Sequence, residues 1–211
     1  MSETTRGKFI VFEGIDGSGK GTQIDLLVQE MKKQGRQVYR TAEPTNTSTG
    51  GMLRDALGGF VRRDAYELSA LFLLDRIFHN VNPINGIRKY LSEGVDVVCD
   101  RYYYSSFAYQ GIDADLKWVM QMNLDCQEII RPDVCIFLDL DPDVSDRRIA
   151  ASRMDREIYE NIEAQQRIRS RFLEVFRLLE DRETIRIVDA SRTIPEVSAD
   201  IIKILEEIKE T

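Results

Sequence analysis

Histidine and cysteine are scarce in this chain, and their scarcity argues against several kinds of catalytic and metal-binding site. His79 is the single histidine, which all but excludes a Ser–His–Asp hydrolase or a histidine-rich zinc site. The three cysteines, Cys99, Cys126 and Cys135, are odd in number and far apart. Two of them fall in predicted strands. We therefore expect small buried thiols in a reducing compartment rather than a disulfide or metal framework.

Long apolar runs and an excess of positive charge are also missing. No window holds the ~18 consecutive apolar residues that a membrane span needs. The first residues have neither the apolar core of a signal peptide nor the composition of a transit peptide. A formal net charge of -7 argues against a general nucleic-acid binder. We expect a soluble cytoplasmic protein with one α/β domain spanning residues 1–211, which binds neither membranes nor nucleic acid.

Short apolar runs alternate with helical patterns along the chain. We predict strands at residues 8–13, 38–41, 95–99, 134–140 and 185–188. Helices are predicted at residues 20–34, 64–93, 115–130, 143–151, 157–181 and 195–209, with a break at Asn82-Pro83 and a polar loop at 43–51. This alternation predicts a five-stranded parallel sheet covered by helices on both faces. Ligands of such a sheet bind at the carboxyl ends of its strands.

The segment between the first predicted strand and helix carries the strongest functional signal. It reads G-I-D-G-S-G-K-G-T, and the residues predicted to bind nucleotide phosphates are Gly14, Ile15, Asp16, Gly17, Ser18, Gly19, Lys20, Gly21 and Thr22. Glycines let backbone N–H groups turn toward one anion, and Lys20 can reach the β- and γ-phosphates. The usual hydroxyl after the lysine is replaced by Gly21, so Thr22 could serve Mg²⁺ only through a shifted geometry or a bridging water. The alternative is a glycine-rich turn that binds nothing, which the flanking strand and helix disfavour.

Asp100-Arg101-Tyr102 stands where the third predicted strand meets the ligand edge of the sheet. The carboxylate of Asp100 can hold Mg²⁺ directly or through water, and the guanidinium of Arg101 offers a planar fork for a phosphate. The alternative is a strand-end aspartate that caps the next turn, with its arginine in solvent. A nearby phosphate loop favours the first interpretation.

Together these segments resemble the thymidylate kinase family of nucleoside monophosphate kinases, from about residue 8 to the C-terminal helix. The matching stretches are F-E-G-I-D-G-S-G-K-G-T-Q, A-E-P-T, L-F-L-L-D-R, D-R-Y-Y-Y-S-S-F-A-Y-Q-G and D-A-S-R. The fourth is the most specific, because the phosphate loop alone also resembles adenylate kinases. The resemblance implies a P-loop kinase fold with a short mobile lid, and transfer of the γ-phosphoryl of ATP to dTMP with Mg²⁺ as cofactor. It also implies a homodimer formed through helices away from the nucleotide.

The resemblance also assigns the residues of the acceptor site. Phe72 would stack on the pyrimidine, although without the resemblance it would be taken for a core residue. Arg76 would hydrogen-bond a base carbonyl and approach the phosphate region, and Arg101 would grip the acceptor phosphate. The other implied positions are Ser105 and Ser106 near the base edge, Tyr109 against the sugar where it leaves no room for a 2′-hydroxyl, and Gln110 in the same wall.

Two acidic residues complete this implied site. Asp16 would meet the 3′-hydroxyl of the acceptor or a metal-bound water. Glu43 would approach the acceptor or its magnesium. The alternative is that Glu43 is a solvated acid in a loop. Ala42 replaces an arginine that the family often has before Glu-Pro, so one phosphate contact is expected to be missing.

A cluster of arginines follows the fourth predicted strand. One branch of the family carries an arginine after the aspartate of its phosphate loop, but here Gly17 follows Asp16. The other branch supplies that charge from a lid, and Arg147, Arg148, Arg153 and Arg156 fall where such a lid, at about residues 147–158, would lie. The expected catalytic residues are then Lys20, Arg101, Arg153, Arg156 and Asp16. The alternative is a solvated helical face. Near the C-terminus, the D-A-S-R stretch with Arg192 resembles the loop that cradles the adenine of the donor.

Two rival functions remain open from the sequence. The first is another nucleoside monophosphate kinase that acts on AMP or on dUMP/UMP. Phe72 and the D-R-Y stretch argue against AMP, but one thymine methyl discriminates only ~10–200-fold. The second is a nucleotide-dependent switch ATPase, which would not need a second basic, aromatic pocket.

Overall fold

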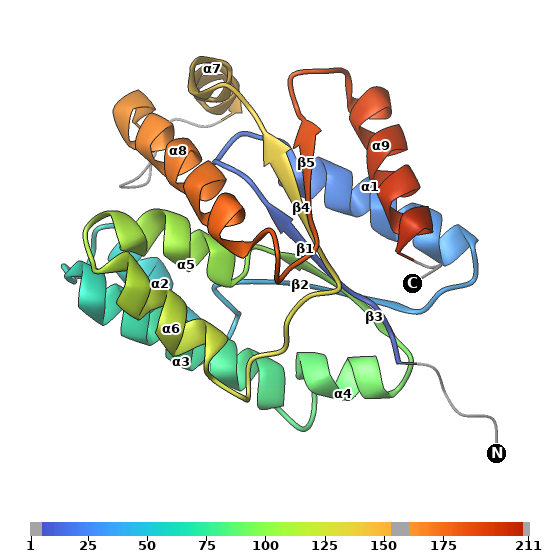
Figure 1. Cartoon of the computed structure of the whole chain (residues 1–211), viewed down its shortest axis with the longest axis horizontal. Coiled ribbons are helices and arrows are strands. Elements are labelled where there is room, and N and C mark those ends of the chain that lie inside the picture. The colour runs from blue at the N-terminus through green and yellow to red at the C-terminus, as the bar shows by residue number, and fades with distance from the viewer. Residues whose placement is uncertain (1–5, 153–160, 209–211) are drawn as a thin grey trace.

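A parallel sheet forms the centre of the protein, whose computed structural model describes residues 6–152 and 161–208 (Figure 1). Its strands are β1 (Phe9–Glu13), β2 (Val38–Ala42), β3 (Asp96–Asp100), β4 (Val134–Asp139) and β5 (Ile185–Asp189). They run in the order β2-β3-β1-β4-β5, with every neighbouring pair parallel. In the centre, Val11 of β1 lies opposite Cys99 of β3 and Cys135 of β4. The predicted five-stranded parallel sheet is confirmed.

Helices cover both faces of this sheet. On one face lie α1 (Lys20–Lys33) and α9 (Ile194–Glu207), as Figure 1 shows. The opposite face is covered by α4 (Ile87–Ser92), α5 (Tyr103–Tyr109) and α8 (Ile162–Leu179). Beyond these, α2 (Ser48–Leu57), α3 (Ala65–Val81) and α6 (Leu116–Leu124) form an outer group, and α7 (Pro142–Ser152) follows β4. Among the described residues, no helix is long and apolar enough to cross a membrane.

Alternation along β1 explains why the core has two halves. Ile10 and Phe12 pack toward α1 and α9, whereas Phe9 and Val11 pack toward α5 and α8. The predicted inner stripes of the first and last helices are buried: Ile24, Leu27, Val28, Met31, Val197, Ile201, Leu205 and Ile208. Cys99 and Cys135 are buried free thiols and Cys126 is partly buried, as expected for residues that serve as small apolar groups.

The structure differs from the sequence predictions at three places: two predictions were wrong and one helix was not predicted. Helix α2 begins at Ser48, inside the predicted loop at 43–51. A Cβ on Gly50 would lie 1.8 Å from the carbonyl oxygen of Thr45, so the glycine that suggests a loop instead allows close packing of a helix. The helix predicted at 115–130 ends at Leu124. Further on, the backbone of Ile130 bonds instead to the side chains of Asn80 and Tyr102.

The third difference is α5, which the sequence did not predict at all. Its first residues, Y-Y-S-S, include aromatic side chains that favour strands when judged by propensity alone. The predicted break near Asn82-Pro83 is confirmed, since α3 ends at Val81 and α4 begins at Ile87.

We expect Phe172→Ala on α8 to lower the free energy of unfolding by about 3–5 kcal/mol, because it empties a fully buried ring site. The Phe172 ring lies 5.0 Å from that of Phe137 and 5.7 Å from that of Phe176. Leu178→Ala is the matched control, since Leu178 lies on the same helix but is 57% exposed and should change stability by no more than about 0.5 kcal/mol. Urea unfolding of both variants measures the difference, and equal losses would contradict the assigned core.

Candidate active site

The phosphate loop joins the carboxyl end of β1 to the start of α1. Gly14, Gly17 and Gly19 have φ angles of 150°, 75° and 92°, which side-chain-bearing residues rarely adopt. No acidic residue lies in the first turn of α1, so nothing there repels an anion. The Nζ of Lys20 donates to the carbonyl oxygens of Gly14 at 3.0 Å and Ile15 at 3.2 Å. The lysine is thus folded across the loop, inside the predicted phosphate cradle.

Gly21 and Thr22 follow Lys20, whereas the usual phosphate loop has a hydroxyl residue directly after its lysine. A Cβ on Gly21 would meet no atom within 4 Å, so packing does not require a glycine there. The side chain of Thr22 is exposed on α1. The metal role of Thr22 stays a prediction.

An ion pair joins this loop to the end of β3. The Nη2 of Arg101 contacts Oδ1 of Asp16, while its Nη1 donates to Ser105 Oγ at 3.1 Å. Arg101 has a φ of 67°, the only positive value at a non-glycine position in the described residues. Burial alone would raise the pKa of Asp16, but Arg101 and Lys20 outweigh it and the pKa is lowered. Asp16 therefore stays ionised and holds Arg101 at the loop.

Glu13, the last residue of β1, is a fully buried carboxylate that the sequence reasoning missed. Its Oε1 accepts hydrogen bonds from the backbone N–H groups of Tyr102 at 2.8 Å and Ser105 at 3.1 Å, and its Oε2 accepts one from Ser105 Oγ at 2.7 Å. Burial raises the pKa of Glu13 to about 7, although Arg101 and these hydrogen bonds oppose the rise. The available signal was a charged residue that ends the apolar run F-I-V-F directly before the phosphate loop.

A cavity of about 420 Å³ opens beside the ion pair. Its walls bring together most of the predicted acceptor residues with several that were not predicted: Asp16, Glu43, Pro44, Arg54, Leu57, Gly58, Phe72, Arg76, Arg101, Tyr102, Ser105, Tyr109 and Gln110. Ser106 does not line it. That hydroxyl is buried behind Arg76, 3.3 Å from Nη1 and Nη2. Phe72 both lines the cavity and packs on the small cluster of Leu53, Ala56 and Leu68.

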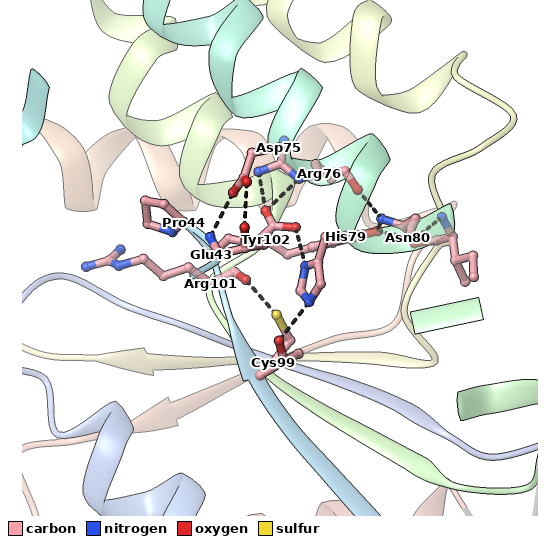
Figure 2. Close-up of polar contacts among 12 residues, drawn as sticks. Glu43, Pro44, Asp75, Arg76, His79, Asn80, Cys99, Arg101 and Tyr102 are labelled. Atoms are coloured by element: carbon pink, nitrogen blue, oxygen red, sulfur yellow. Dashed lines mark hydrogen bonds and ion pairs between the residues drawn. The ribbon is translucent and has the colours of Figure 1, made fainter. Parts of the chain in front are cut away.

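Arg76 is fully buried and its guanidinium is held on several sides (Figure 2). Its Nε donates to Glu43 Oε2 at 2.8 Å, and its Nη1 donates to Asn123 Oδ1 at 2.6 Å. The other oxygen of Glu43 lies 3.0 Å from Nδ1 of His79. Glu43 is therefore not a solvated loop acid; that alternative was wrong. The pair fixes the cationic group in one orientation at the cavity wall.

The segment after Glu43 is anchored to α3 by Asp75, a second residue that the sequence reasoning missed. Its carboxylate accepts from the backbone N–H of Thr45 at 2.8 Å, from Thr45 Oγ1 at 2.6 Å and from Thr49 Oγ1 at 2.6 Å. Burial would raise the pKa of Asp75, but these hydrogen bonds lower it. The charge is thus satisfied by hydroxyl and amide donors, and the cavity wall is rigidly placed.

Comparison with known proteins identifies the family. The sequence pattern described as thymidylate kinase matches residues 12–201. The chain belongs to the thymidylate kinase family. It is 38% identical over 209 residues to a probable thymidylate kinase of Pyrococcus horikoshii, covering 95% of this chain and 97% of that one. It is 36% identical over 204 residues to a thymidylate kinase of Symbiobacterium thermophilum, covering 95% and 93%.

A solved structure supports the same conclusion for the fold. The thymidylate kinase of Candida albicans, described as having broad substrate specificity, superposes with a TM-score of 0.83 at 25% sequence identity and covers 97% of this chain and 93% of that one. The protein thus has the P-loop kinase fold of the thymidylate kinase family.

The structure describes some, but not all, of the metal-binding and lid residues that membership of the thymidylate kinase family implies. Oδ1 of Asp100 is buried with no hydrogen-bond partner in the described part of the chain, which suits a carboxylate that faces a cation.

Arg148 Nη2 donates to the carbonyl of Ala190 at 3.2 Å, and Arg192 is paired with Asp200. A Cβ on Gly17 would lie 3.0 Å from the carbonyl oxygen of Ser145, so no larger side chain fits there without a shift. Arg153 and Arg156 lie outside the described residues.

The raised pKa of Glu13 gives a test by pH. Because about 7 lies above the ordinary value of 4.5, the folded chain binds this proton more tightly than the unfolded chain does between those pH values. The stability of the wild type relative to Glu13→Gln should therefore fall, by roughly 3 kcal/mol in all, as pH rises through that window, and should level off above it. Chemical denaturation of both proteins across the window measures this difference. A difference that does not change with pH would show that Glu13 ionises normally.

Proposed function

We propose that this enzyme transfers the γ-phosphoryl group of ATP to the 5′-phosphate of dTMP, giving dTDP and ADP. The observation that carries this proposal is the aromatic and basic cavity beside the phosphate loop, joined to it by the Asp16–Arg101 ion pair. A switch ATPase has no need of such a second pocket. Family membership supports the same reaction and does not favour the rival functions.

Phosphoryl transfer here rests on positioning and on neutralising charge. Lys20 would exchange its contacts with the loop carbonyls for the donor phosphates, and Arg101 would hold the acceptor phosphate. Both groups then face the charge that spreads over the transferring phosphoryl. The acceptor phosphate is already an anion, so no general base is required.

Mg²⁺ fits the chemistry of the residues present. Asp100 has a buried carboxylate oxygen with no partner among the described residues, and Thr22 follows on α1. The described residues hold no group of three or more His, Cys, Asp or Glu side chains that could bind a metal, which agrees with the habit of Mg²⁺ to use one or two carboxylates together with substrate phosphates. When bound, the ion would neutralise phosphate charge.

The cavity suits a pyrimidine deoxynucleotide. Phe72 offers a flat face to the base, and Tyr109 would close the space that a 2′-hydroxyl needs. Every N–H of Arg76 already has an acceptor, so a hydrogen bond to a base carbonyl would require one of these contacts to be given up. Discrimination of dTMP from dUMP is limited to ~10–200-fold, because it depends on one methyl group. Ser106 would act on the base through Arg76, which its hydroxyl contacts.

We further propose a cytoplasmic homodimer with a lid at about residues 147–158 that carries Arg153 and Arg156 as catalytic groups. An apolar stripe on α3 supports the dimer: Leu74, Phe78 and Val81 are 52%, 42% and 38% exposed. Their i, i+4, i+7 spacing places them on one helix face. Arg192 would contact the adenine of ATP.

The proposed reaction is tested by measuring ADP release with a panel of monophosphates. We expect turnover that requires an acceptor, with dTMP the best, dUMP weaker by ~10–200-fold in kcat/KM, and AMP inactive. Turnover that does not need any acceptor would instead support a switch ATPase.

Phe72→Ala should raise KM for dTMP at least about tenfold and leave KM for ATP nearly unchanged, because it removes stacking on the acceptor base alone. Leu68→Ala is the control, since Leu68 lies on the same helix and packs in the same small cluster without lining the cavity. Steady-state kinetics and thermal melts of both are needed. If the two variants lose stability alike and neither changes KM, Phe72 is only a core residue.

Leu74→Glu combined with Phe78→Glu should convert a dimer to a monomer, because charges on an apolar interface are left without partners. Light scattering after size-exclusion chromatography measures this mass. Leu178→Glu, an equally exposed apolar site on α8, should leave the dimer intact. A wild-type protein that is a monomer at micromolar concentration would refute the proposed assembly.

A further inference from the structure

The helix that carries much of the acceptor site does not cap itself. The first N–H groups of a helix need acceptors from outside the helix, and the N-cap residue of α5 is Tyr102, whose hydroxyl bonds to Asn80 and Ile130 instead. Glu13 supplies the missing acceptor from the end of β1. It accepts from the N–H groups of both Tyr102 and Ser105, which are the N-cap and third positions of the helix.

The same carboxylate reaches Arg101 through one hydroxyl. Ser105 has a single O–H, which it donates to Glu13 at 2.7 Å, and this leaves its lone pairs to accept from Arg101 Nη1 at 3.1 Å. Arg101 also holds the left-handed backbone conformation described above, which costs free energy and persists only where its surroundings enforce it. Glu13 fixes the residues on the C-terminal side of that bend.

An ionised carboxylate matches this set of donors. A carboxylate is acceptor-only, and here it faces three donors; an amide in its place would turn an N–H₂ toward at least one of them. Lys20 and Arg101 are the positive groups that act on it, and the buried thiols of Cys99 and Cys135 feel its charge. Holding this charge in the core opposes stability, as its raised pKa indicates, which points to a role beyond packing.

We propose that Glu13 is a positioning residue for phosphoryl transfer, which sets Arg101 and the start of α5 at a fixed spacing from the phosphate loop. Glu13 lies next to Gly14 of the phosphate loop in the chain, and it holds the start of α5 by hydrogen bonds. One side chain therefore sets the position of the acceptor site relative to the donor site. This inference rests on the proposed function, since it assigns Arg101 to the acceptor phosphate.

Glu13→Gln should lower kcat at least ~10-fold while KM for ATP stays within about threefold of wild type, because the loss falls on the alignment of Arg101. Glu183→Gln is the matched control. Glu183 also holds α5, through the hydroxyls of Tyr103 and Tyr104, but it lies outside the acceptor cavity. We expect the kcat of Glu183→Gln to remain within about threefold of wild type, even if its melting temperature falls as much as that of Glu13→Gln. A kcat for Glu13→Gln no lower than that of Glu183→Gln would overturn the inference.

Ser105→Ala keeps the test decisive if Glu13→Gln does not fold. It removes the bridge between Glu13 and Arg101 and leaves both capped N–H groups in place, so kcat should again fall, and unchanged kcat would overturn the inference. Where all variants fold, the double variant should lose little more than Glu13→Gln alone, as expected for residues that act in one chain of contacts. Failure of the proposed function looks different: the wild type itself would then show no dependence on dTMP.

Discussion

The ion pair between Asp16 and Arg101 joins the two halves of the site, and most other features serve to hold it. Asp16 sits in the phosphate loop, whereas Arg101 follows β3. These strands are neighbours in a parallel sheet, so their carboxyl ends meet at one edge. The sheet is buried on both faces and thereby holds the two strand ends in a fixed relation. Glu13 and Ser105 carry that rigidity on to the guanidinium.

A second buried cation, Arg76, shapes the acceptor cavity by a related device. Glu43 neutralises it and His79 contacts the other carboxylate oxygen, while Asp75 ties the next segment to the same helix. The single histidine of the chain thus has a structural place in a polar network. Such networks are costly when half satisfied but rigid when complete, so the wall of the cavity is held in one arrangement.

Features that arise from nearby residues could be read from the sequence, and those that depend on distant partners could not. Apolar periodicity gave the strands and the inner stripes of α1 and α9, and glycine spacing marked the phosphate loop. The family resemblance placed Phe72 and Tyr109 at the cavity that the structure contains. Helix α5 was not predicted because its cap comes from Glu13, which lies 89 residues before Tyr102 in the chain. The resemblance placed both Ser105 and Ser106 near the base edge, and only Ser105 lines the cavity, because sequence does not show which of two neighbouring side chains faces a pocket.

A crystal structure with dTMP and a non-hydrolysable ATP analogue tests the central claim most directly, namely that one rigid edge of the sheet aligns two phosphates. The account predicts that Lys20 leaves the carbonyls of Gly14 and Ile15 for the donor phosphates and that Arg101 contacts the acceptor phosphate. The pyrimidine should lie on Phe72, and the hydrogen bonds from Ser105 to Glu13 should remain. An acceptor bound outside this cavity, or an Arg101 that contacts neither nucleotide, would contradict it.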